Sequence, residues 1–240
     1  MIKFSFEVPI KHLNTFHDKQ DYIFALSFLC KNKPYWEYLK QCRRDNCTII
    51  LDNSYNELKV ATPVEEMLDI FYPIEADYMI CPDNDLWPID KYMEVLDEVK
   101  LNISLDKLYM VARNPLHYKA FKDAGVKNIA IPYEFRPWYF NYNNDGFSAD
   151  RNSNFLKNSH FLGLNTYYEP KAFQCNSCDT SMPIKLALEG ITLERWIEKG
   201  CYHIDTDLDF FRLEMTKEQV ETARHNIDIL KRITNKKEEV

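Results

Sequence analysis

Aspartates stand at the ends of several short apolar runs of this chain. Asp52, Asp83 and Asp179 each lie at, or just after, the end of such a run. Polar side chains at the carboxyl ends of parallel strands gather at one crevice or barrel mouth. Two carboxylates around one substrate carbon supply a nucleophile and a proton shuttle for a glycosidic centre. The three aspartates therefore predict chemistry at a glycosidic bond.

Each of these aspartates, considered alone, also has an explanation that involves no catalysis. Most aspartates in proteins are solvated or cap helices, and Asp83 or Asp85 could cap a helix that begins near Pro88. Catalysis by a serine or cysteine nucleophile has less support, because the sequence shows no serine or cysteine with an obvious histidine base. His117 is expected to be a surface or capping residue at a helix start.

The elements that must position these side chains follow from hydrophobic periodicity. Apolar runs rich in β-branched residues predict strands, and helical spacing follows several of them. The predicted strands cover residues 2–6, 48–51, 77–81, 108–112, 128–131, 160–164 and 177–179. The predicted helices between strands cover residues 63–71, 89–99 and 116–124, the last ending at Gly125.

This alternation is typical of βαβ units and predicts the α/β class with parallel strands. An open doubly wound sheet and a closed (β/α) barrel both satisfy it. No GxGxxG or GxxxxGK[ST] motif follows the first predicted strand, so the nucleotide-binding forms of the open sheet lose their main support.

Length and composition indicate one domain over residues 1–240. The chain is 45% hydrophobic and carries a net charge of −7, so any nucleic-acid contact needs a local basic patch. No apolar stretch is long enough to span a membrane, and the N-terminus lacks the layout of a signal peptide. We therefore expect a cytoplasmic protein that does not enter membranes.

Two segments depart from the strand and helix alternation. Residues 134–158 are rich in aromatic residues, Asn and Asp, which indicates a long binding loop or lid, or a packed surface excursion. Residues 216–233 carry apolar side chains at helical spacing, which predicts an amphipathic C-terminal helix.

The seven cysteines are expected to be mostly buried, reduced thiols. Cys175 and Cys178 form one CxxC pair, and Cys201 and His203 follow it. Structural zinc sites need four ligands, and a second CxxC pair is missing. We therefore favour thiols over zinc and predict neither a metal nor a cofactor.

Three segments together resemble the tRNA-guanine transglycosylase superfamily, whose members exchange guanine for a 7-deazaguanine on a (β/α)8 barrel. They are residues 178–190 with Asp179, residues 51–54 with Asp52, and residues 76–83 with Asp83. The match covers about residues 45–190. The resemblance implies a single-domain (β/α)8 TIM-type barrel. It also implies that Asp179 is the nucleophile, Asp52 the general acid/base, and Asp83 a ligand of the guanine edge.

The departures from the family pattern favour one of its branches. Asn53 and Ser54 replace glycines after Asp52, and Ala112 or Arg113 replaces the base-contacting Gln. The zinc-binding CxCxxC stretch of the tRNA enzymes is missing after Gly190. The chain is therefore most similar to the phage and bacterial 7-deazaguanine DNA transglycosylases, which implies host cytoplasm if it is phage-encoded. The other residues expected to bind substrate are Asn53, Ser54, Arg113, Tyr133, Gly163 and Lys185.

The resemblance implies a DNA-modifying transferase that exchanges guanine for a 7-deazaguanine, with 7-cyano-7-deazaguanine as the expected base. Its partners would be DNA, the free base and the other proteins of a DNA-modification system. Three alternatives stay open: transfer on tRNA, hydrolysis by a nucleoside or DNA glycosylase on the same barrel, and a non-catalytic DNA-binding barrel.

Overall fold

The computed structural model describes residues 4–132, 159–162, 181–199, 204 and 206–235. The chain divides into two compact units, of which the larger covers residues 24–162 and the smaller covers residues 1–23 and 163–240. We describe each unit by itself, and the single domain expected from the sequence stays a prediction.

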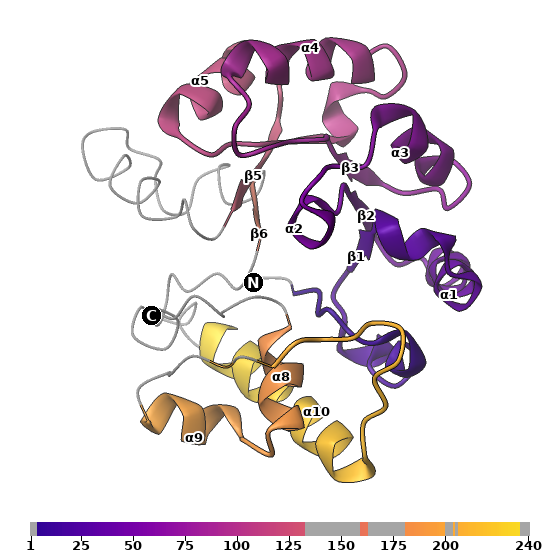
Figure 1. Cartoon of the computed structure of the whole chain (residues 1–240), viewed down its shortest axis with the longest axis vertical. Helices are drawn as coiled ribbons and strands as arrows, with labels where there is room; N and C mark the ends of the chain where they lie inside the picture. Colours follow the sequence, from indigo (N-terminus) through magenta and orange to yellow (C-terminus); the bar gives the residue numbers. More distant parts are fainter. Residues whose placement is uncertain (1–3, 133–158, 163–180, 200–203, 205, 236–240) are drawn as a thin grey trace. The chain divides into compact units, whose positions relative to one another are not determined.

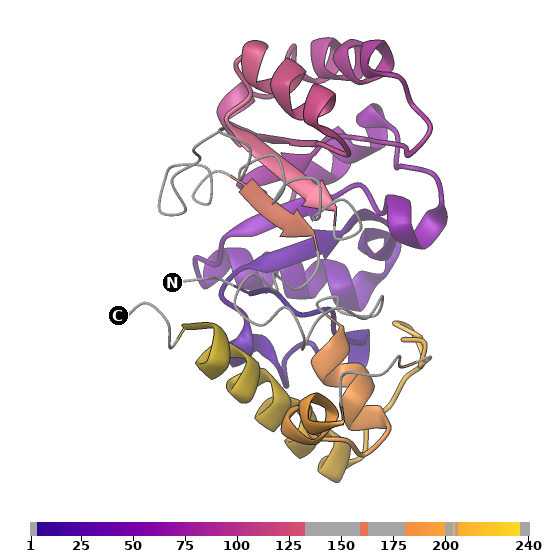
Figure 2. The same cartoon turned by 90° about the vertical axis from the view of Figure 1, so that its left-hand side faces the viewer.

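The larger unit is built on one sheet whose strands follow sequence order (Figure 1). The strands are β1 (Ile23–Leu26), β2 (Ile49–Asp52), β3 (Tyr78–Ile80), β4 (Leu108–Val111), β5 (Asn128–Pro132) and β6 (Ser159–Leu162). Neighbours from β2 to β6 pair in parallel. Figure 2 shows β5 and β6 as adjacent arrows that run the same way. The predicted α/β class with parallel strands is therefore confirmed.

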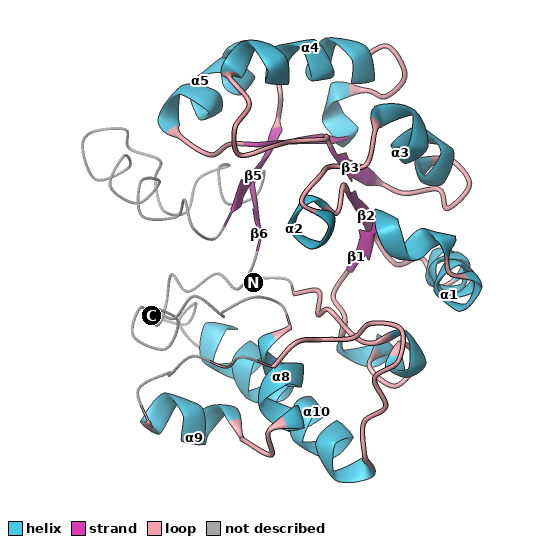
Figure 3. Cartoon of the chain, viewed as in Figure 1, coloured by secondary structure: helices cyan, strands magenta, loops and turns pink. Residues whose placement is uncertain are grey.

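Helices connect the strands, and the longer ones cover one side of the sheet (Figures 1 and 3). They are α1 (Lys33–Arg44), α2 (Tyr55–Leu58), α3 (Val64–Phe71), α4 (Ile89–Val99) and α5 (Pro115–Asp123), with short 3₁₀ turns at Ser27–Lys31 and Leu105–Lys107. The longer helices bury their apolar faces; in α3, for example, Val64, Met67, Ile70 and Phe71 are buried at helical spacing. The helices predicted over residues 63–71, 89–99 and 116–124 are confirmed.

Local sequence explains where two of these helices start and stop. The Asn32 side chain accepts a hydrogen bond from the Tyr35 amide at the start of α1, and Asn114 accepts one from the His117 amide at the start of α5. Gly125 follows α5 with a φ of +83°, a conformation that glycine adopts without steric cost. The local sequence thus specifies the starts of α1 and α5 and the end of α5.

The smaller unit contains η1 (Ile10–His12), η2 (His17–Lys19), α8 (Met182–Leu188), α9 (Leu193–Glu198) and α10 (Lys217–Asn235). α8 and α9 both contact α10. Asn226 of α10 is fully buried and hydrogen-bonds the backbone of Pro183, Ile191 and Leu193, which ties the three helices together. The C-terminal helix predicted over residues 216–233 is confirmed.

The strand predicted over residues 2–6 is wrong for the part that the structure describes, residues 4–6. The Phe4 and Phe6 amides donate to the side chains of Asp21 and Gln20, at 2.9 Å and 2.7 Å. Their rings are buried and stack 5.9 Å apart. Side chains thus take the hydrogen bonds that the Phe4 and Phe6 amides would otherwise give to a neighbouring strand, and the first strand of the sheet lies at β1 instead.

His12 makes the smaller unit sensitive to pH. Its Nε2 accepts a hydrogen bond from the Met215 amide at 2.9 Å, which requires an unprotonated nitrogen. Burial lowers the pKa of His12, Glu214 raises it, and Lys11 lowers it further, with a net lowering. The unfolded chain therefore binds this proton more readily than the folded chain does, and stability is lost as pH falls below about 6.5.

We expect urea denaturation between about pH 8 and pH 5.5 to show this loss, because the His12 proton breaks the bond to Met215. The variant His12→Gln can still accept that bond without titrating over this range, and its stability should vary less with pH. An equal pH dependence in both proteins would contradict the assignment.

No helix in the described part of the chain is long and apolar enough to cross a membrane.

Candidate functional site

Polar side chains from three consecutive strands meet at the carboxyl edge of the sheet. Asp52 is the last residue of β2, Asp83 follows β3, and Arg113 follows β4. Because β2, β3 and β4 are parallel neighbours, these positions fall at the same edge. All three residues are buried, with 8%, 3% and 5% of their surface exposed, respectively. The structure thus brings together three of the residues expected at the site.

The central contact is a buried ion pair between Asp83 and Arg113. Arg113 Nε donates to Asp83 Oδ2 at 3.0 Å, and its Nη2 contacts the same oxygen. Asn53 Nδ2 donates to the other oxygen, Oδ1, at 2.8 Å. Both carboxylate oxygens of Asp83 are therefore held, and a carboxylate oxygen can still accept a further hydrogen bond.

The charges of this pair stabilise each other. Burial raises the pKa of Asp83, the facing guanidinium of Arg113 opposes that shift, and the net shift is upward. Burial lowers the pKa of Arg113, but attraction to Asp83 outweighs it and the net shift is upward. Arg113 also contacts Asp85, whose side chain is 47% exposed. We therefore describe the site as one buried cation held between one buried and one half-exposed carboxylate.

Asp52 has the electrostatic setting of a proton donor. Burial raises its pKa well above the ordinary value, and repulsion by Glu57 and Asp83 adds to the rise. The Ser54 amide donates to Asp52 Oδ2 at 2.7 Å, which opposes the shift without cancelling it. Asp52 therefore holds its proton at higher pH than a solvated carboxyl group does.

The turn after β2 fixes the position of Asn53. Asn53 Nδ2 donates to the Cys81 carbonyl at 2.7 Å as well as to Asp83, and its Oδ1 accepts from the Tyr55 amide at 2.9 Å. Ser54 has a φ of +57° and is fully buried. Asn53 thus holds the Asp83 carboxylate and the turn in place, and the substrate contacts expected of Asn53 and Ser54 stay predictions.

The Ser54 hydroxyl faces a small polar cluster rather than the carboxylates. Ser27 Oγ donates to Ser54 Oγ at 2.9 Å, and Ser27 Oγ lies 2.7 Å from Thr62 Oγ1. The Phe28 amide also donates a hydrogen bond to Ser54 Oγ, at 3.3 Å. Ser54 thus ties the start of α2 to the segment after β1.

Two tyrosines, Tyr55 and Tyr92, interact with the Arg113 guanidinium. It lies over the Tyr55 ring, 5.2 Å from the centroid. Tyr92 of α4 is fully buried, donates to the Asn84 carbonyl at 2.8 Å and has its pKa raised to about 12 by burial. The ring of His117 packs 4.8 Å from that of Tyr92, so the surface position expected for His117 is wrong.

Sequence reasoning missed Asp85, Tyr55 and Tyr92 as parts of this site. Asp85 lies two residues after Asp83 and was weighed only as a helix cap, although α4 begins after Pro88 without a side-chain cap. The aspartate pair flanking Asn84 was the available signal for Asp85. The sequence pattern does not indicate Tyr55 or Tyr92, since each lies more than 20 residues from Arg113 in the sequence and only the fold brings them together.

Several expected site residues lie outside the described residues, namely Tyr133, Gly163 and Asp179, together with the aromatic segment 134–158. Lys185 is described; it lies on α8 in the smaller unit and is half-buried. The zinc ligands that we considered, Cys175, Cys178, Cys201 and His203, also lie outside the described residues. In the larger unit, Cys42 and Cys47 offer two neighbouring sulfur atoms, half the ligands of a structural zinc site.

No protein-family model matches this chain, and neither a curated protein nor a solved structure matches it.

The arrangement offers two chemical capabilities side by side. Asp52 can give a proton to a leaving group, and the buried Asp83 carboxyl group can accept hydrogen bonds, with the Arg113 guanidinium opposing the rise in its pKa that burial causes. A planar ligand with N–H donors and a basic leaving atom would use both groups at once.

Proposed function

We propose that this protein is a base transglycosylase that exchanges guanine in DNA for a 7-deazaguanine, with 7-cyano-7-deazaguanine as the incoming base. The observation that carries the proposal is the burial of Asp52 beside the buried pair of Asp83 and Arg113 at consecutive strand ends, a setting that raises the pKa of Asp52. A proton donor and a base-binding carboxylate are the two groups that purine departure needs besides the nucleophile. Asp179 is the proposed nucleophile.

The strand order supports a (β/α)8 barrel as the complete fold. In a doubly wound sheet, the order reverses at a switch point. Here β1 to β6 follow one another without reversal, and the longer helices cover one side of the sheet. That is the order of successive barrel strands, and the run at 177–179 would supply the next strand, with Asp179 at its end.

The proposed reaction has two steps. In the first, an Asp179 carboxylate oxygen forms a bond to C1′, the C1′–N9 bond breaks with its electron pair going to N9, and Asp52 protonates the departing guanine. In the second, Asp52 takes the N9 proton of the incoming base, N9 bonds to C1′, and the Asp179 carboxylate leaves. Positioned proton transfer of this kind contributes about 10²–10⁴ in rate.

Asp83 and Arg113 would hold the base during both steps. Asp83 can accept from the N–H groups on the Watson–Crick edge of guanine, and the same edge is present in the 7-deazaguanine. Asn53 and Arg113 fix the Asp83 carboxylate before the base arrives. Because the Asp83 carboxylate is already fixed, it loses little conformational entropy when a ligand binds. The pair of Asp83 and Arg113 therefore favours a rigid, planar ligand.

The proposed substrate sets two further requirements. A base inside duplex DNA is out of reach, so the enzyme must extrude it or act on single strands, at a cost of about a few kcal/mol. The net charge of −7 does not attract DNA as a whole, so we propose that proteins of a DNA-modification system help to deliver it. The chemistry uses side chains alone and needs no cofactor.

The test is incubation of the full chain with labelled 7-cyano-7-deazaguanine and, in parallel, duplex DNA, single-stranded DNA or tRNA. Nucleosides are then separated and identified by mass spectrometry, with heat-denatured protein as the control. We expect label in deoxynucleosides and an equal amount of released guanine.

Each alternative gives a distinct result that contradicts the proposal. Label in ribonucleosides alone indicates a tRNA enzyme. Guanine release without label indicates a hydrolytic glycosylase. DNA binding with neither release nor label indicates a non-catalytic barrel.

A further inference from the structure

The end of helix α1 has the geometry of a Schellman motif. Asn46 adopts a left-handed conformation, with a φ of +59°. The Cys47 amide donates to the Cys42 carbonyl at 2.9 Å, and the Asn46 amide donates to the Arg43 carbonyl at 3.1 Å. These are the two hydrogen bonds of the motif, and they bring the first and last of its residues side by side.

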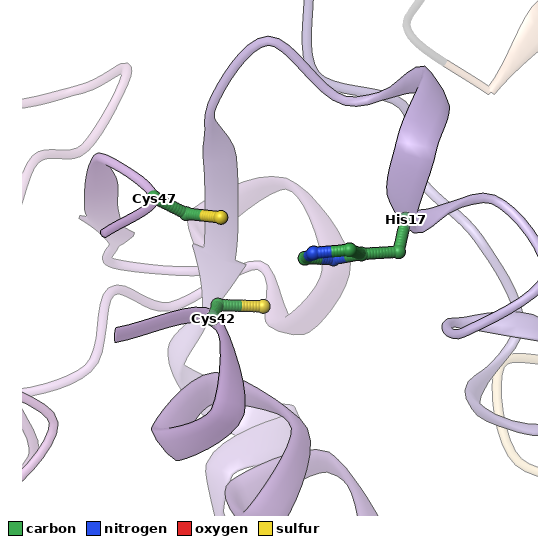
Figure 4. A group of neighbouring side chains, drawn as sticks. All are labelled: His17, Cys42 and Cys47. Atoms are coloured by element: carbon green, nitrogen blue, oxygen red, sulfur yellow. The ribbon is translucent and has the colours of Figure 1, made fainter. Parts of the chain in front are cut away.

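In this chain, both of those residues are cysteines. Figure 4 shows Cys42 at the end of α1 and Cys47 ahead of β2, with their sulfur atoms on the same side of the backbone. The two sulfurs lie within 4.8 Å of each other. Cys42 is fully buried and Cys47 is half-buried, so a reagent in solvent reaches Cys47 first.

A hydrophobic contact between these two positions is common in Schellman motifs, and most residue types that provide it have no further chemistry. Two cysteines at these positions have a further possibility, because their thiols can form a disulfide once the sulfur atoms approach to about 2.05 Å. Rotation of the side chains can supply this approach while the two backbone hydrogen bonds hold the Cα atoms close.

We propose that Cys42 and Cys47 form a reversible disulfide with a small organic disulfide, such as oxidised glutathione, as the oxidant. The Cys47 thiolate attacks the small disulfide, which forms a mixed disulfide and releases one small thiol. Cys42 then loses its proton and attacks the Cys47 sulfur, which forms the protein disulfide and releases the second small thiol. The two protein thiols are oxidised, and one small disulfide is reduced to two thiols.

The surroundings of the two sulfurs set the rate and the order of these steps. Burial raises the pKa of Cys42 to about 12 and also raises the pKa of Cys47. The thiolate is the attacking species, so exchange is slow at neutral pH. The disulfide would join Cys42, near the end of α1, to Cys47, two residues before β2. That strand ends at Asp52.

The experiment treats the native full chain with oxidised glutathione at about pH 8.5, blocks the remaining thiols, and digests the protein with trypsin. Cleavage after Arg43 and Arg44 separates the two cysteines, so the disulfide appears as peptide 41–43 linked to peptide 45–59. We expect this linked species to dominate in native protein and to revert with excess reduced glutathione. Urea-unfolded protein, as the comparison, should give mixed pairings of the seven cysteines.

Two variants test the order of the steps. Cys42→Ser should stop at a stable mixed disulfide on Cys47, and Cys47→Ser should leave Cys42 reduced. Cys30→Ser, which removes another buried thiol, should form the 42–47 link as the wild type does. Native protein without the linked species, or with the same mixed pairings as unfolded protein, would overturn the proposal. The result does not depend on the proposed base exchange.

Discussion

Replacing Asp52 by Asn is expected to lower the rate of base exchange by about 10²–10⁴, with little change in fold. Asn has nearly the same shape and can still accept from the Ser54 amide through its side-chain oxygen, but it cannot donate a proton to departing guanine. The measurement is single-turnover release of guanine from DNA. Far-ultraviolet circular dichroism checks that the variant remains folded.

The pH profile gives a second readout of the same group. The first step needs protonated Asp52, so the rate of guanine release should fall as pH rises through the raised pKa of Asp52. Glu57 contributes to that rise by repulsion. In Glu57→Gln, the pKa of Asp52 should therefore drop, and the alkaline fall in rate should begin at a lower pH.

A comparison with Asp179→Ala separates the two proposed roles. Without a nucleophile, this variant should form no covalent adduct with DNA at any time, whereas Asp52→Asn should form the adduct slowly. Asp69→Asn, an exposed position on α3, is the control and should match the wild type. An Asp52→Asn enzyme with wild-type release and an unchanged pH profile would contradict a general-acid role.

The sequence predicted the central βα units well because their signals are local. Pro88 before Ile89, and Asn114 with Pro115 before His117, mark helix starts without reference to the rest of the chain. β1 was missed because Ile23–Leu26 is too short for periodicity to distinguish it from other apolar runs. Helix α1 was also missed, since Tyr and Cys supply much of its buried face.

Part of the candidate site was predictable, because it depends on the order of the strands along the chain. Parallel strands place their ends together, so Asp52, Asp83 and Arg113 could be grouped from order alone. What each side chain contacts depends on residues far along the chain. The Ser54 hydroxyl, for example, is held by Ser27, a residue 27 positions away in the sequence. The role of Asp179 stays a prediction, because that residue lies outside the described residues.

Replacing Arg113 by Met is expected to destabilise the protein by about 3–5 kcal/mol. Met fills much of the arginine volume, so the main loss is the charge that neutralises the buried Asp83 carboxylate. Asn53 would remain as its hydrogen-bond donor, which does not replace a full positive charge. The measurement is the free energy of unfolding in urea at about pH 7.5.

Arg43→Met is the matched control, because Arg43 also pairs with two carboxylates, those of Glu75 and Asp77. Its side chain is 38% exposed, and its ion-pair distances are 3.4 Å. Solvent screens such pairs, so we expect a loss below about 1 kcal/mol. The difference between the two arginine variants measures the effect of burial on an ion pair.

The double variant Asp83→Asn with Arg113→Met tests the cause of the destabilisation. It removes both buried charges, so it should recover most of the stability that Arg113→Met loses. In Arg113→Met alone, the folded pKa of Asp83 should lie further above its unfolded value, and its destabilisation should grow as pH rises. If the double variant were as unstable as Arg113→Met, the cause would be lost packing around the substituted side chain rather than an unpaired carboxylate.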